Sequence, residues 1–181
     1  MLKKIIFSVL LIGTSIQSSQ AFDIDAFRQL AEDTVRQLDM GVVGDIDAMI
    51  AMQEQLMIIG VEGGVSYVKS GGKDSTPLRL TLLNAETMKK MSLEKIEEQW
   101  HEGKFLASKG IDKDKIDHFG PVMNLMDTVI HPATSYIALR KYKKTGDASL
   151  LGRAKAELAE VLVHLEQYAQ SQNGTQVNTN H

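Results

Sequence analysis

The chain has 181 residues, of which 43% are hydrophobic and 24% charged, with three prolines and no cysteine. This composition is typical of one globular domain with a core, and it excludes a disordered or collagen-like chain. The absence of cysteine excludes disulfides, thiol catalysis, cysteine-based zinc or iron–sulfur sites and c-type haem attachment. A formal net charge of −3 argues against sequence-independent binding to nucleic acid, which needs a dense basic face.

The first 21 residues have the pattern of a cleavable secretory signal. Lys3 and Lys4 are followed by an apolar run over residues 5–16, and Ser19 and Ala21 then place small residues just before Phe22. The run is too short to span a bilayer comfortably, and no later stretch holds the ~18 consecutive apolar residues of a membrane span. We therefore expect a bacterial protein exported to the periplasm, with no membrane span after signal cleavage; the alternative is an uncleaved membrane anchor.

The next part of the chain is predicted to form two helices. Over about residues 25–40, apolar residues recur at three- and four-residue steps, and Gly41 ends the pattern. Asp45 is a candidate N-cap for a second, methionine-rich helix. Three glycines then follow, and they either break this helix or let a neighbouring helix approach closely: Gly60, Gly63 and Gly64.

The middle of the chain contains two further helix starts. Thr76-Pro77 is typical of a cap followed by proline at the first helical position, although alternating leucines leave a short strand over 78–83 as an alternative. Ser92 is the predicted cap of the next helix, and Gly110 ends it.

Two long helices complete the predicted fold. An apolar stripe runs from Val122 through Pro132 to Ile137 without a change of phase, which predicts one long helix kinked at Pro132. Gly146 ends it, and Asp147 caps a last helix with heptad-like apolar spacing. Long helices joined by a short loop lie antiparallel.

The expected fold is therefore all-α, an antiparallel helical bundle of four to six helices with a proline-kinked long helix near the C-terminus. The expected organisation is a signal peptide over 1–21, one helical domain over 22–170, and a disordered polar tail over 171–181.

The histidines are the main candidates for chemistry. Four of the five follow an acidic residue by four positions, which is one turn of a helix: Glu97/His101, Asp114/His118, Asp127/His131 and Glu160/His164. These pairs have two interpretations. They are either local acid–imidazole pairs that stabilise separate helices, or parts of a metal site in the bundle interior.

Other metal and catalytic motifs are absent or incomplete. Glu98 and His101 match the Glu-x-x-His spacing of di-iron bundles, but that site needs the motif twice and it occurs once. Residues 112–117 begin like a calcium loop but lack its glycine and its last glutamate. There is no nucleophile elbow, His-Glu-x-x-His helix, phosphate loop or Rossmann fingerprint.

A polar pocket is plausible beside the proline, because His131 precedes Pro132, where a backbone carbonyl loses its helical partner. The candidates for this ligand pocket or for a metal are Glu97, Glu98, Trp100, His101, Asp127, His131 and Tyr136. No catalytic residue is predicted.

The preferred hypothesis is an exported, non-enzymatic helical protein that binds an envelope partner protein or a small apolar ligand, with no cofactor. It is based on the missing catalytic motifs and the methionine-rich second helix, since methionine suits adaptable binding surfaces. The alternative is a bundle that binds a divalent metal or haem through its histidines and carboxylates. A third hypothesis is a hydrolase or lyase with an unrecognised His/acid site.

Overall fold

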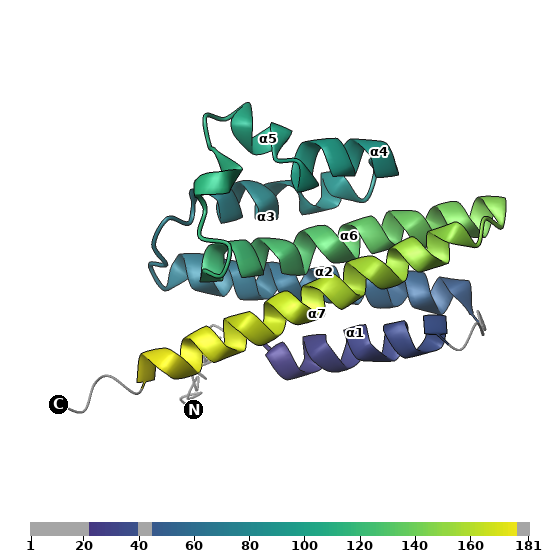
Figure 1. The fold of residues 1–181 in the computed structure, drawn as a ribbon, viewed down its shortest axis with the longest axis horizontal. Coiled ribbons are helices and arrows are strands. Elements are labelled where there is room, and N and C mark those ends of the chain that lie inside the picture. The colour runs from purple at the N-terminus through teal and green to yellow at the C-terminus, as the bar shows by residue number, and fades with distance from the viewer. Residues whose placement is uncertain (1–21, 40–44, 177–181) are drawn as a thin grey trace, which may run out of the picture.

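The computed structural model describes residues 22–39 and 45–176, and all regular structure in these residues is helical (Figure 1). The long helices are α1 (Ile24–Asp39), α2 (Ile46–Lys69), α3 (Thr76–Met88), α6 (Pro121–Thr145) and α7 (Ser149–Gln176). The short elements are α4 (Leu93–Ile96), the π-helical turn η1 (Glu97–His101), α5 (Lys104–Ala107) and the 3-10 turn η2 (Lys113–Lys115). The prediction of an all-α bundle is confirmed. The predicted signal over 1–21 lies outside the described residues, and α7 reaches Gln176, within the segment predicted to be a polar tail.

Two of the predicted helix caps are confirmed, Asp45 and Ser92. The Asp45 carboxylate accepts hydrogen bonds from the backbone N–H groups of Asp47 and Ala48, at 2.9 and 3.1 Å. The Ser92 side chain caps α4 in the same way. Helix α3 is confirmed, but it begins at Thr76 with Ser75 at the cap position, so Thr76 is the first helical residue rather than the cap, and the alternative of a strand over 78–83 is wrong.

Helix α6 is the central helix of the molecule. Every residue from Val122 to Leu139 is buried. In Figure 1, α3, α4 and α5 lie on one side of α6, with α2 and α7 on the other, and α1 lies beyond them along α7. Helix α6 continues through Pro132 as one element, as the unbroken apolar stripe predicts. A polar side chain on α6 therefore meets other protein groups rather than solvent.

The glycines of α2 allow close helix packing and do not break the helix. A Cβ at Gly60 would lie 2.5 Å from the backbone carbonyl oxygen of Thr128 on α6. That carbonyl has no helical partner, because Pro132, four residues later, has no N–H. Gly60 therefore packs directly against the part of α6 that precedes Pro132.

The segment after Ser92 differs from the single helix that the sequence predicts. It forms α4, the turn η1 and α5, separated where Gly103 adopts a left-handed conformation with φ of 76°. The Lys113 side chain then donates a hydrogen bond to the carbonyl of His101 at 2.6 Å. A π turn adds a residue to the helical turn and is frequent at functional sites. The break determines where the His101 side chain lies.

Candidate metal site

A stripe of polar residues runs along the buried helix α6. Its members recur at three- and four-residue steps and all are buried: Asn124, Asp127, Thr128, His131, Thr134 and Ser135. Burying polar groups is unfavourable unless each finds a partner. Asp127, His131 and Thr134 find polar side chains of other elements, whereas Thr128 and Asn124 donate to backbone carbonyls.

The outer cluster is formed by Asp127 and His131 of α6 with His164 of α7. His164 Nδ1 lies 2.6 Å from Asp127 Oδ2, and His131 Nε2 faces Asp127 Oδ1 at 3.9 Å, beyond hydrogen-bond distance. All three side chains are buried, and one ligand atom from each lies within 4.8 Å of the others. Two imidazoles and one carboxylate thus face a common point between α6 and α7.

The inner cluster is formed by His131, His101 and Glu157 of α7. His131 Nδ1 lies 2.8 Å from Glu157 Oε2, while the other carboxylate oxygen accepts a hydrogen bond from Arg153 Nε at 2.7 Å. Arg153 also pairs with Glu97. Both oxygens of the buried Glu157 carboxylate are therefore engaged by protein groups.

His101 joins the inner cluster from the end of η1. Its Nε2 lies 2.9 Å from Thr134 Oγ1 and 3.6 Å from Glu157 Oε2. The Thr134 hydroxyl donates to the carbonyl of Ile130 at 3.0 Å, so its lone pairs are available to accept from His101. The polar stripe of α6 thus contacts η1 through Thr134 and α7 through Asp127 and His131.

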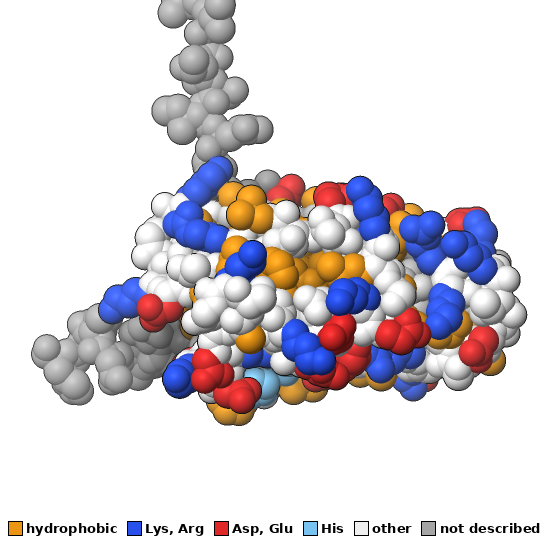
Figure 2. All heavy atoms as spheres, turned by 90° about the horizontal axis from the view of Figure 1, so that it is seen from above, with side chains coloured by type: hydrophobic (Ala, Val, Ile, Leu, Met, Phe, Trp, Pro, Cys, Tyr) orange, Lys and Arg blue, Asp and Glu red, His pale blue; other side chains and the backbone are white. Residues whose placement is uncertain are grey.

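The four histidines of the described residues form a continuous line. Ring centroids are 5.1 Å apart between His101 and His131, 5.8 Å between His131 and His164, and 5.4 Å between His164 and His118. Each neighbouring pair meets edge to face. His118 is exposed on the segment before α6, and Figure 2 shows a histidine side chain at the surface beside acidic side chains. The line runs from the bundle interior to solvent.

The electrostatics of the inner cluster follow from burial and pairing. Burial lowers the pKa of His131, but the hydrogen bond to Glu157 and the charge of Asp127 outweigh it and raise the pKa above its usual value. Burial raises the pKa of Glu157, but His131, His101 and Arg153 together bring it below its usual value. For His101, burial is the largest effect and lowers the pKa. His131 and Glu157 form a buried charged pair.

The structure brings together three of the seven predicted site residues, namely His101, Asp127 and His131. Glu97 lies next to them through Arg153. Glu98 pairs instead with Lys95 and Lys104 at the surface, at 3.0 and 3.2 Å.

The two predicted aromatic members of the site have other contacts. Trp100 packs on Phe105, with ring centroids 4.6 Å apart. The Tyr136 hydroxyl accepts a hydrogen bond from Arg140 at 3.4 Å. Neither contact involves a histidine of the two clusters.

Sequence reasoning missed Glu157 and Arg153, and it named His164 in an acid–histidine pair but not among the candidate site residues. Of the four acid–histidine pairs, Asp127 and His131 remain within 4 Å of each other. His101 and His164 contact acids of other helices instead. The polar stripe of α6 was a signal in the sequence that could have indicated the buried face.

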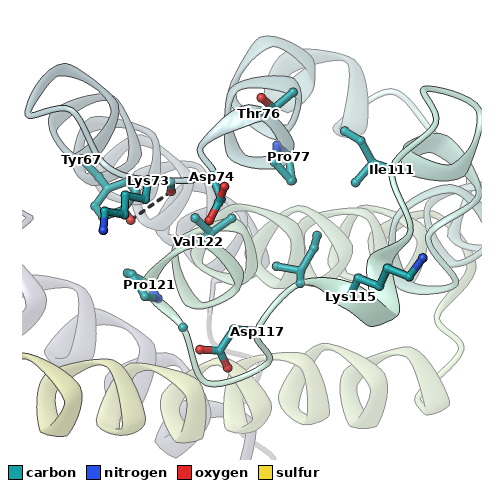
Figure 3. Close-up of a pocket in the computed structure, with 12 residues that line it drawn as sticks. Tyr67, Lys73, Asp74, Thr76, Pro77, Ile111, Lys115, Asp117, Pro121 and Val122 are labelled. Atoms are coloured by element: carbon teal, nitrogen blue, oxygen red, sulfur yellow. Dashed lines mark hydrogen bonds between the residues drawn. The ribbon is translucent and has the colours of Figure 1, made fainter.

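A separate pocket of about 590 Å³ lies where α2 ends and α3 and α6 begin (Figure 3). Its lining is mixed: Pro77, Ile111 and Val122 offer apolar surface, and Lys115 and Asp117 stand at its edge. The pocket is open to solvent and shares no lining residue with the histidine line.

No protein-family model, curated protein or solved structure matches this chain. In the described part of the chain, no helix combines the length and apolar character needed to cross a bilayer.

Proposed function

We propose that this protein binds one divalent transition-metal ion through Asp127, His131 and His164. The observation that carries the proposal is the set of three buried side chains whose ligand atoms lie within 4.8 Å of one another. Imidazole and carboxylate donors between the helices of a bundle are a common way to hold such an ion. This function was the alternative hypothesis from the sequence.

The outer cluster is a better ion site than the inner one because of charge. In the inner cluster, Glu157 is already paired with the cationic Arg153, and both its oxygens are engaged. A second positive charge there would be opposed by Arg153. In the outer cluster, the Asp127 carboxylate faces two imidazoles, and His131 Nε2 points at it across a 3.9 Å gap.

The inner cluster supports the outer one. An ion bound at Nε2 replaces the proton there, so that His131, with its Nδ1–H donated to Glu157, offers the lone pair of Nε2 to an ion held beside Asp127. A carboxylate behind a ligating imidazole fixes its tautomer and orientation and makes it a stronger donor. Arg153 in turn holds Glu157 in place.

The donor set favours ions such as Zn²⁺ over Mg²⁺ or Ca²⁺, because the latter two prefer all-oxygen ligands. The test uses the purified full chain, treated with chelator, and titrates it with Zn²⁺ by calorimetry. We expect one equivalent to bind, with a rise in unfolding temperature that chelator reverses, because ligand bound to the folded state stabilises it.

The variants His131→Gln and Asp127→Asn should each lose this binding while keeping the helical circular dichroism spectrum. The matched control is Glu98→Gln, which removes a surface carboxylate paired with lysines and should bind as the parent does. The proposal is overturned if the parent binds no more Zn²⁺ than His131→Gln does.

A second candidate function is binding of a small, largely apolar molecule, which the sequence analysis preferred. The pocket lined by Pro77, Ile111 and Val122 favours it, since its volume suits a small ligand. An Ile111→Trp variant, at a half-buried residue of the lining, should fill the pocket and abolish uptake of a fluorescent apolar probe. Unchanged uptake would exclude this pocket. Export to a bacterial periplasm, expected from residues 1–21, remains part of both proposals.

A further inference from the structure

We infer that His118 is the fourth protein ligand of the outer cluster and closes it from the solvent side. This inference rests on the proposed function, because it concerns the same ion. It assigns a residue from outside the helices to a site otherwise built by α6 and α7.

The position of His118 fits this role. Its ring centroid lies 5.4 Å from that of His164, similar to the 5.8 Å between His164 and His131. Two imidazoles bound to one tetrahedral ion, with metal–nitrogen bonds of about 2.0–2.1 Å, have centroids roughly 5 Å apart. His118 is therefore next to His164 at the spacing expected for two ligands of one ion, and a rotation of its side chain has to bring a ring nitrogen to the three ligand atoms that already lie within 4.8 Å of one another.

The segment that holds His118 is tied to the site by hydrogen bonds. Asn124, on the polar stripe of α6, donates to the carbonyls of Phe119 and Gly120, both at 3.1 Å. The Asp117 carboxylate accepts from the N–H of Phe119 at 3.1 Å. His118 lies between these anchored residues, so its backbone is held beside α7 while its exposed side chain can turn toward the ion.

The consequence is a closed site. Three protein ligands leave a position for water, which is the arrangement of catalytic zinc, whereas four ligands are the arrangement of structural zinc. A His₃Asp site closed by His118 holds an ion without activating a water molecule. This agrees with the absence of known catalytic motifs in the sequence.

The experiment uses Co²⁺ as a spectroscopic probe on the full chain, followed by competition with Zn²⁺. The parent should show the intense visible bands of tetrahedral Co²⁺. His118→Ala should weaken Zn²⁺ binding about tenfold or more, by comparison with the loss known for outer-shell partners of metal sites. It should also change the Co²⁺ bands, as water replaces an imidazole.

Two further variants complete the design. Glu160→Gln tests the competing ligand, one turn before His164 on α7, and should leave both the affinity and the bands unchanged. His118→Gln, at an exposed position, provides a second variant that should fold normally and repeat the loss. Circular dichroism and unfolding temperature verify folding of each.

The outcomes separate the two proposals. If the parent binds neither Co²⁺ nor Zn²⁺, the proposed function itself fails. If the parent binds but His118→Ala gives the same affinity and the same bands, His118 is not a ligand, while the three-ligand site remains. If Glu160→Gln rather than His118→Ala changes the bands, Glu160 is the fourth ligand and the inference is overturned.

Discussion

At the residue scale, Glu157 is the most consequential side chain of the buried cluster. Its carboxylate is 5% exposed and bonds His131 on one side and Arg153 on the other. Removing one member of a buried ion pair leaves its partners charged and unpaired, which is strongly destabilising. Glu157 therefore contributes to folding stability as well as to the orientation of His131.

We predict that Glu157→Ala lowers the free energy of unfolding by about 3 kcal/mol at pH 6 in the presence of chelator. Urea unfolding followed by circular dichroism measures this. Glu166→Ala, at an exposed position further along α7, is the matched control and should stay within about 0.5 kcal/mol. Equal losses in the two variants would contradict the pairing seen here.

The loss should depend on pH with a defined sign. The pKa of His131 is raised on folding, so its stabilisation is full below an unfolded pKa of about 6.5 and is lost as pH rises through the folded value. The pKa of Glu157 is lowered, so its stabilisation is present above about 4.3 and is lost as pH falls through the folded value. The cost of Glu157→Ala should thus be greatest between about pH 5 and 6.5 and smaller at pH 9, where Arg153 alone pairs with Glu157.

At the scale of elements, the contact between α2 and α6 depends on one glycine. The Thr128 carbonyl and hydroxyl oxygens would lie 2.5 and 2.8 Å from a Cβ at Gly60. The nearest of these is a backbone atom, which cannot move aside without displacing α6. Larger residues at this position force the two helices apart, next to the turn of α6 that carries His131.

We predict that Gly60→Ala destabilises the protein by about 2 kcal/mol, although alanine is the better helix former. Gly152→Ala on α7 is the matched control, because no atom lies within 4 Å of its Cβ position. There the gain in helix propensity is unopposed, and stability should rise by up to about 1 kcal/mol. Denaturant unfolding of both variants provides the comparison, and a stabilised Gly60→Ala protein would falsify the close packing.

At the scale of the whole molecule, α6 connects two layers of helices. On one side, its apolar residues pack with Trp100 and with α3 in the largest core cluster. On the other side, its polar stripe faces α7, which forms a second core cluster with α1 and α2. If α6 separated from one layer, buried residues of the other layer would be exposed as well.

We therefore predict cooperative unfolding of both layers. Trp100 is 1% exposed and is the one tryptophan of the chain, so its fluorescence reports the layer of α3, α4 and α5. Circular dichroism reports all helices. The two probes should give coincident denaturant midpoints, as two-state unfolding requires. An earlier midpoint for Trp100 would show that the upper layer in Figure 1 unfolds independently.

The sequence by itself determined the features that depend on neighbours along the chain. Asp45 and Ser92 cap helices because a short polar side chain bonds the free N–H groups of the following turn. The helix through Pro132 followed from apolar spacing of one helical turn. The same local rule paired each histidine with the acid four residues before it.

Only the tertiary structure decided which acids the histidines meet. Glu157 reaches His131 across 26 residues and Asp127 reaches His164 across 37, because α7 folds back along α6. The π turn and Gly103 determine where His101 lies, and no apolar periodicity shows such a break. Periodicity records which face of a helix is buried, whereas the partner of a buried charge depends on how separate helices pack, and that packing makes the candidate metal site.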